Sequence, residues 1–208
     1  MFVDIHTHKP FGPSEYPAIK NLTFTEAEKI LSISEKGLFS VGFHPWNADE
    51  FSMENRNKLE KLANDKRFVM VGECGLDKNS NVSLDIQLNV FEYQIALSEK
   101  VQKPLIIHCV GCFNELFELK KRLNPRQLWI IHGFRGKPEL AKQALKLGIS
   151  LSFGEHFNSE SVILTPIEKL FVETDESRLP IDEIYHAIST IKNCTETDLI
   201  AGEMLMKC

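Results

Sequence analysis

The sequence predicts an α/β protein whose parallel sheet closes into a compact (β/α)8 TIM-type barrel. Three observations support this fold class. Short apolar runs alternate with amphipathic stretches almost throughout the 208 residues. These runs are apolar on both faces, which is typical of parallel strands covered by helices. Eight of them can be found, the number that a closed barrel of this type requires.

The predicted elements follow one another along the chain. The strand candidates share a short apolar, β-branched composition. They are Phe2–His6, Ala18–Leu22, Leu38–Phe43, Phe68–Gly72, Pro104–His108, Leu128–His132, Ile149–Phe153 and Leu170–Thr174. The helix candidates share a helical spacing of apolar residues. They are Glu26–Glu35, Met53–Asn64, Leu84–Lys100, Cys112–Leu123, Pro138–Leu147 and Ile181–Lys192, and a last short helix is expected after Thr195 or Thr197 as its cap.

The connection after the first strand contains Pro10, Pro13 and Pro17, which disfavour a helix. We therefore expect a loop in place of the first helix. This fits the chain length, because barrels of this type usually need about 250 residues. An open doubly wound sheet would carry a glycine-rich phosphate loop after an early strand, and the sequence has none. Residues 1–208 are expected to form one domain.

The composition narrows the class of protein. A net charge of −5 argues against binding nucleic acid through a broad basic surface, although a local basic rim or bound cations remain compatible with it. No secretory signal and no apolar run of membrane-spanning length are found. Five scattered cysteines indicate reduced thiols, so we expect a cytoplasmic protein. Cys109 and Cys112 form the only CxxC, and they are expected to be incidental.

Polar residues gather where the predicted strands end. Asp4, His6 and His8 alternate along the first strand and therefore share one face. The remaining members of the set are His44, Glu73, His108, His132 and Asp175. In a barrel, the carboxyl ends of the strands converge on one mouth. Nitrogen and oxygen ligands without thiolate suit divalent metals, and this many ligands suit two ions sharing a bridging carboxylate.

Several motifs occur in an order that resembles the TatD-type metal-dependent hydrolases of the amidohydrolase superfamily. They are DIHTH, SVGFHPWN, VGECGLD, PLIIHC, IIHGFRG, GISLSFG and VETD, together with the pattern of Gln87 to Leu97. The resemblance implies that His6, His8 and Asp175 hold one metal. It also implies that Glu73 bridges to a second metal, which His108 and His132 complete.

The resemblance further implies two divalent ions per chain, Mg²⁺, Zn²⁺ or Mn²⁺, and a DNase that cleaves DNA or another phosphodiester. Metal-activated water would be the nucleophile, with Asp175 as the catalytic proton acceptor. Asp4 would contact a metal-binding side chain and orient it, without binding the metal itself. No membrane and no obligate protein partner are expected.

Two departures from the family pattern leave substrate binding open. Val110 stands where an arginine is usual, and Glu176 replaces the proline after the TD pair. Arg135 and Lys137 could bind phosphate instead, or belong to a solvated loop. His44 could contact substrate or make a structural hydrogen bond, and Trp46 could stack on a base or fill the barrel rim.

Three hypotheses for function therefore compete. The leading one is a phosphodiesterase acting at nucleic-acid ends. The second keeps the metals but hydrolyses a small amide, ester or lactone, which the negative net charge and Val110 favour. The third is a non-catalytic metal-binding scaffold, which the complete set of candidate ligands disfavours.

Overall fold

The computed structural model describes residues 1–9, 16–33 and 36–207. By their internal contacts, the residues of the chain group into two compact units. Unit 1 comprises residues 1–20 and 130–208, and unit 2 comprises residues 21–129.

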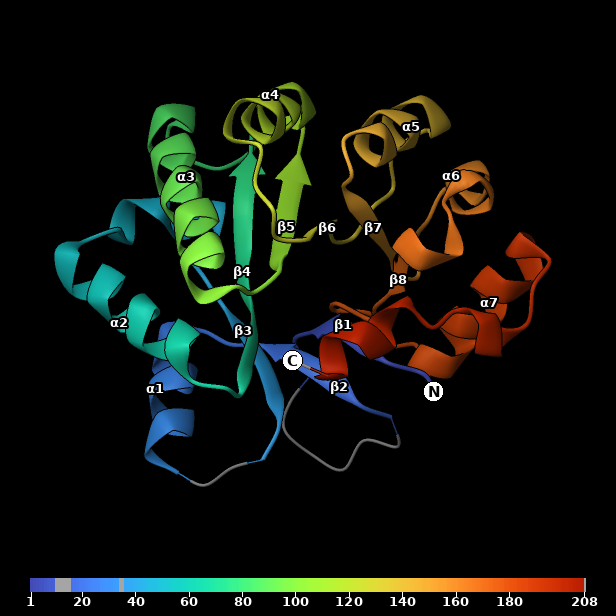
Figure 1. Cartoon of the computed structure of the whole chain (residues 1–208), viewed down its shortest axis with the longest axis horizontal. Coiled ribbons are helices and arrows are strands. Elements are labelled where there is room, and N and C mark those ends of the chain that lie inside the picture. The colour runs from blue at the N-terminus through green and yellow to red at the C-terminus, as the bar shows by residue number, and fades with distance from the viewer. Residues whose placement is uncertain (10–15, 34–35, 208) are drawn as a thin grey trace. The chain divides into compact units, whose positions relative to one another are not determined.

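Unit 2 is built on three parallel strands in the order β3 (Leu38–Val41), β4 (Phe68–Asp77) and β5 (Leu105–Val110). The helices of the unit are α1 (Phe24–Ser32), the 3-10 helix η1 (Pro45–Glu50), α2 (Met53–Asn64), α3 (Leu84–Val101) and α4 (Phe113–Leu123). Helix α3 packs along β4, as Figure 1 shows in green.

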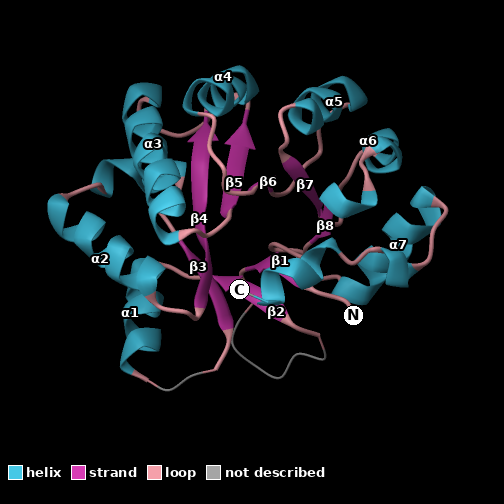
Figure 2. Ribbon diagram, in the orientation of Figure 1, coloured by secondary structure: helices cyan, strands magenta, loops and turns pink. Residues whose placement is uncertain are grey.

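Unit 1 contains the two ends of the described chain. Its strands are β1 (Asp4–Thr7), β2 (Ala18–Asn21, ending at the unit boundary), β6 (Trp129–Ile131), β7 (Ser150–Phe153) and β8 (Leu170–Val172). All pairings are parallel: β1 with β2, and β6 with β7 and then β8. Its helices are α5 (Pro138–Lys146), α6 (Ser159–Leu164), η2 (Ile167–Lys169), α7 (Ile181–Lys192), η3 (Glu196–Asp198) and η4 (Ala201–Lys207), coloured cyan in Figure 2.

All eight predicted strands are present, with shifted ends. Strand β4 runs beyond the predicted end at Gly72 to Asp77, because Gly75 and Asp77 continue the pairing with β5. Helix α1 begins before the predicted Glu26, because Thr23 caps it through a reciprocal capping box with Glu26. Its predicted end at Glu35 lies outside the described residues, as do residues 10–15 of the predicted loop after the first strand.

The sequence analysis did not predict three short helices, η1, α6 and η2, and the C-terminal helix takes a different form. Helix α6 is a single short segment capped by Asn158, and η1 starts at Pro45. The predicted C-terminal helix is two 3-10 segments, and Thr195 is the residue that caps the first of them. None of the described helices combines the length and the apolar run needed to cross a bilayer.

Two buried glutamines on α3 hold the ends of neighbouring strands in unit 2. Gln94 accepts a hydrogen bond from Phe43 N at 2.8 Å and donates one to Phe43 O at 3.0 Å. Gln87 accepts from Asp77 N at 2.8 Å and donates to Asp77 O at 3.0 Å. The two glutamines are seven positions apart, close to two helical turns, so they share one face of α3. They fix the backbone directly beside His44 and at Asp77.

Gly42 is required for this approach of α3 to the strand ends. A Cβ atom at residue 42 would lie 2.6 Å from Gly72 Cα and 2.7 Å from Gln94 Oε1. Both distances are shorter than real side chains tolerate. The glycine therefore lets the backbone before His44 pass close to β4 and to the Gln94 amide.

Replacing Gln94 by leucine should lower the free energy of unfolding by about 2–5 kcal/mol. The substitution keeps an apolar stem but leaves the N–H and C=O of Phe43 buried without partners, each worth about 1–3 kcal/mol. Urea denaturation measures the change. As a matched control, Gln143→Leu on the exposed side of α5 should stay within about 0.5 kcal/mol of the unmodified protein. Equal effects of the two substitutions would contradict the structural role of Gln94.

Candidate metal centres

The first cluster of candidate ligands lies in unit 1, where β1 meets the residue that follows β8. Asp175 N donates to His6 O at 2.9 Å, and His8 N donates to Asp175 O at 3.2 Å. Asp175 has a φ of +52°, a left-handed conformation that aspartate tolerates better than most residues. These backbone bonds bring the Asp175 carboxylate to His6 of β1 and to His8 just after it.

The distances between these side chains suit a shared cation. Asp175 Oδ1 lies 3.8 Å from His6 Nε2 and 3.6 Å from His8 Nε2. A tetrahedral ion with bonds of about 2.0–2.1 Å would hold its ligand atoms roughly 3.3 Å apart. The three atoms are thus within reach of one ion, and small side-chain movements would complete the coordination.

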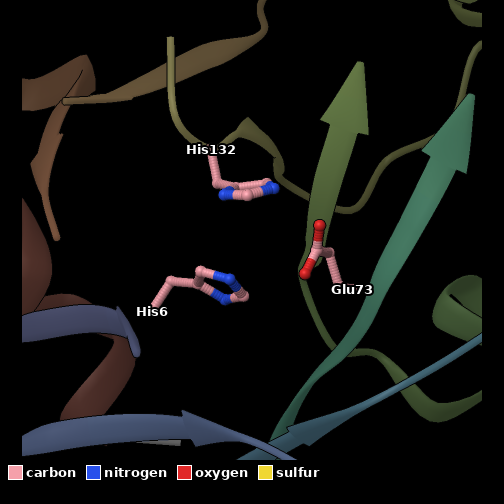
Figure 3. Close-up of side chains that lie close together, drawn as sticks. All are labelled: His6, Glu73 and His132. Carbon is pink, nitrogen blue, oxygen red and sulfur yellow. The ribbon is translucent and has the colours of Figure 1, made fainter. Parts of the chain in front are cut away.

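His132 and Glu173 extend this cluster. The rings of His6 and His132 have centroids 4.4 Å apart, and Figure 3 shows the two side chains projecting from β1 and from the end of β6. His132 Nδ1 lies 3.5 Å from Oε1 of the fully buried Glu173, which also accepts a hydrogen bond from Gly133 N. Burial favours the neutral acid, but the hydrogen bond and charge of His132 and the charge of His6 lower the pKa of Glu173 overall.

Sequence reasoning missed Glu173. It places a carboxylate with His132 and Asp175 in a further group of potential ligands. The signal was present in the motif VETD, where an acid ends the apolar strand β8 two positions before Asp175. Because acids are rarely buried without a partner, an acid at the end of an apolar strand is a candidate metal ligand.

Asp4 forms hydrogen bonds to Thr174, the residue before Asp175. Its Oδ1 accepts a hydrogen bond from Thr174 N at 2.9 Å, and its Oδ2 accepts one from Thr174 Oγ1 at 2.6 Å. Burial raises the pKa of Asp4 to about 6, although the two bonds from Thr174 oppose this shift. Asp4 thus contacts the neighbour of a candidate ligand, where the sequence analysis expected contact with the ligand itself.

The second cluster lies in unit 2 and is centred on Glu73 of β4, which Figure 3 also labels. Glu73 Oε1 lies 3.2 Å from His44 Nε2 and 2.9 Å from His108 Nδ1. Asn21 Oδ1 accepts a hydrogen bond from Glu73 N at 2.8 Å, which fixes the backbone that carries the carboxylate. Two imidazoles and one carboxylate therefore form a second group with the spacing of metal ligands.

The hydrogen bonds on the far sides of the two rings assign different roles to the histidines. His108 Nε2 lies 3.0 Å from Asp77 Oδ2, and in the tautomer whose Nε2 donates to this carboxylate, Nδ1 presents its lone pair to Glu73. Two lone pairs at this distance call for a cation or a second proton between them. His44 Nδ1 instead accepts a hydrogen bond from Trp46 N at 3.2 Å, so the proton of the neutral ring is on Nε2, facing Glu73. His108 is therefore the better ligand, and His44 the better hydrogen-bond donor.

Asp77 and Trp46 complete this arrangement, and the sequence analysis assigned no role to Asp77. Asp77 is buried, and its Oδ2 accepts hydrogen bonds from His108 and, at 2.8 Å, from Trp46 Nε1. Burial opposes ionisation, but the bonds from Asn79 N, Trp46 and His108 outweigh it and lower the pKa of Asp77. An ionised Asp77 orients His108, as a carboxylate behind a metal-binding histidine does.

A cavity of about 330 Å³ opens beside Asp175 in unit 1. Of the predicted substrate-binding residues in this unit, Arg135 lines the cavity, whereas Lys137 is the N-cap residue of α5 and does not line it. The acids of the cavity outnumber its bases. Its charged and imidazole residues are Arg135, His156, Glu155, Glu173, Asp175 and Glu176.

The CxxC thiols take no part in the described clusters. Burial raises the pKa of Cys109 and of Cys112, which disfavours the thiolate that metal binding requires. No cysteine belongs to any group of potential ligands among residues 1–9, 16–33 and 36–207.

Solved structures share the fold of this chain. A crystal structure of YjjV, a TatD homologue from Escherichia coli, matches with a TM-score of 0.82 at 18% identity, covering 99% of this chain and 95% of that chain. A TatD-family hydrolase from Entamoeba histolytica matches with a TM-score of 0.74 at 18% identity, covering 99% and 97%. Together with eight parallel strands in chain order, these matches confirm the predicted (β/α)8 barrel class.

Curated relatives match at about 30% identity. The metal-dependent hydrolase YabD of Bacillus subtilis is 30% identical over 162 residues, which are 74% of this chain and 64% of that protein. The 3'-5' ssDNA/RNA exonuclease TatD of a Pantoea species is 31% identical over 146 residues, or 65% and 56%. The chain therefore spans less than two thirds of the length of these relatives. A family model described as TatD related DNase matches residues 15–191. Because that match covers most of the sequence, the chain belongs to the family of TatD-related DNases.

Proposed function

We propose that this protein is a metal-dependent hydrolase that cleaves phosphodiester bonds at nucleic-acid ends, using two divalent cations (Mg²⁺, Zn²⁺ or Mn²⁺) per chain. The observation that carries the proposal is the presence of two separate groups of two imidazoles and one carboxylate, one in each unit. His8 and Asp175 follow β1 and β8, and Glu73 and His108 lie in the carboxyl-terminal halves of β4 and β5. Barrels of this type carry their chemistry toward the carboxyl ends of their strands.

The proposed ligands divide between the two units. In unit 1, His6, His8 and Asp175 would hold one cation. His132, which the sequence analysis assigned to the second metal, lies beside His6 in this unit and could supply a further nitrogen here. In unit 2, Glu73 and His108 hold the other. This donor set of imidazole and carboxylate without thiolate suits Zn²⁺ and Mn²⁺, and accommodates Mg²⁺ where carboxylates predominate.

Side chains in and beside the clusters can each be assigned a chemical role. A divalent cation bound here polarises a phosphoryl oxygen and lowers the pKa of water. Asp175 is partly exposed and lines the cavity, so its carboxylate can accept a proton from the attacking water. His44 directs its Nε2 proton into the unit 2 cluster, where it can donate to Glu73 or to a substrate oxygen.

Two observations bear on the substrate. Several relatives are named as exonucleases of single-stranded DNA and RNA, which favours a nucleic-acid end as substrate. The cavity of unit 1 favours a second candidate, a small amide, ester or lactone, because its acids would repel a phosphate chain unless cations and Arg135 offset them. The scaffold hypothesis is disfavoured, because two open groups of ligands offer a purely structural protein no advantage.

Replacing Glu73 by glutamine should remove about one of the two cations per chain. The neutral amide no longer offsets the charge of an ion beside His108, so the unit 2 cluster loses affinity. Elemental analysis of protein purified without added metal measures the occupancy. The control Glu118→Gln, on the exposed face of α4, should keep the full metal content. Unchanged occupancy in the Glu73 variant would remove Glu73 from the proposed ligands.

Replacing Asp175 by asparagine should lower kcat by about 10²–10⁴-fold at saturating metal, because the proton acceptor is lost. KM should change far less, since the substitution preserves the shape of the cavity. Steady-state kinetics on single-stranded DNA measures both parameters. Glu176→Gln is the matched control, because it removes the same charge from the same cavity without touching β1. Near-normal turnover by metal-loaded Asp175→Asn would exclude Asp175 from catalysis.

Replacing Arg135 by alanine should raise KM for single-stranded DNA and weaken the salt dependence of cleavage. Each phosphate contact releases counterions, so its loss should reduce the log–log salt slope by roughly 0.7–1. Lys137→Ala tests the second predicted contact, and Lys142→Ala, exposed on α5, is the control. Superimposable salt profiles for wild type and Arg135→Ala would favour the small-molecule substrate instead.

A further inference from the structure

Trp46 is exposed and yet held in place. Its residue surface is 60% accessible, whereas the other tryptophan, Trp129, is fully buried. Its indole Nε1 donates to Oδ2 of the buried Asp77 at 2.8 Å. An exposed tryptophan on a short helix would ordinarily be free to change rotamer, but this bond anchors the polar edge of the ring. Most of the remaining indole surface therefore meets solvent in a defined orientation.

The anchored indole stands directly beside the unit 2 cluster. Its ring centroid lies 5.2 Å from that of His44, at an interplanar angle of 88°. His44 is in turn 4.6 Å from His108, centroid to centroid. Trp46 is thus one imidazole ring removed from the candidate ligand His108. A group bound at the cluster would have the indole next to it.

The exposure of Trp46 is inconsistent with a role as a packing residue. Large aromatic side chains contribute to stability mainly by removing apolar area from water, and this ring leaves most of its area there. The hydrogen bond to Asp77 alone does not require an indole, because smaller donors could satisfy a carboxylate. What the indole adds is a flat, rigid and electron-rich face of low conformational entropy.

We propose that Trp46 is a stacking platform for a nucleobase of the substrate strand, next to the phosphodiester that is cleaved. This inference rests on the proposed nuclease function and adds a base-binding subsite to it. Stacking on an aromatic side chain tolerates every base, because each base has a π face. The subsite would therefore hold the strand without selecting its sequence. It would also add an uncharged contact to the strand, whose phosphates meet more acids than bases in the cavity of unit 1.

A cycle of protein and substrate changes tests the platform. Trp46→Ala should raise KM for a short oligodeoxyadenylate by between about 5-fold and about 100-fold, the range expected for one stacked base. Trp46→Phe keeps an aromatic face but loses the bond to Asp77, so it should retain much of the affinity. On oligonucleotides with one abasic site at successive positions from the end, the effect of Trp46→Ala should vanish at one position. Met53→Ala, an exposed apolar residue at the start of α2, is the control.

The alternative role, orientation of His108 through Asp77, makes opposite predictions. In that case Trp46→Phe would be as impaired as Trp46→Ala, kcat and metal content would fall, and abasic positions would make no difference. That pattern would overturn the platform.

Tryptophan fluorescence provides a measurement independent of turnover. Because Trp129 is buried, quenching by acrylamide reports mainly on Trp46. Binding of the oligonucleotide to metal-loaded Asp175→Asn should quench the emission and protect it from acrylamide, and the oligonucleotide lacking the stacked base should do neither. If the unmodified protein cleaves DNA but its Trp46 remains equally accessible, the platform is wrong and the nuclease function stands. If it neither binds nor cleaves DNA, both proposals fail.

Discussion

Buried polar groups need partners, and this constraint shapes both units at their strand ends. A buried donor or acceptor without a partner costs about 1–3 kcal/mol, which is a large part of the stability of a domain. The protein meets the constraint with side chains that reach the backbone of distant segments. Gln94 binds both polar groups of Phe43, and Asp4 binds two groups of Thr174. In each case the segment that is held also carries a candidate functional residue, His44 or Asp175.

The same constraint determines which ring nitrogens are available to a metal. Asp77 is placed to accept a hydrogen bond from Nε2 of His108, which leaves Nδ1 toward Glu73. The amide of Trp46 occupies Nδ1 of His44, which leaves a proton toward Glu73. Two histidines at similar distances from one carboxylate therefore offer a lone pair and a proton respectively. A cluster that combines a ligand and a donor can hold a cation and still donate a hydrogen bond to a substrate oxygen.

Position 110 and the cavity beside Asp175 offer little positive charge for binding phosphate. Val110 contributes no charge where a basic residue would assist phosphate binding, and the cavity beside Asp175 contains more acids than bases. Cations bound at the clusters would reverse this local potential. Arg135 lines this cavity, and the exposed indole of Trp46 is an uncharged surface beside the other cluster.

The sequence by itself determined the class of fold, the eight strands and the ligand types, because these depend on local patterns. Successive side chains of an extended segment point to opposite faces, so His6 of β1 and His8 just after it share one face. Apolar runs that end in polar residues mark the strand ends. Only the tertiary structure decided which residues serve these ligands. Asp77 and Trp46 are 31 positions apart, and Gln94 and Phe43 are 51 apart. Such pairs depend on strand register and on helix packing, which no local periodicity encodes. The motif VETD marks Glu173 as an acid at a strand end, but its burial against His132 arises only when β8 and β6 are brought to their places around β7.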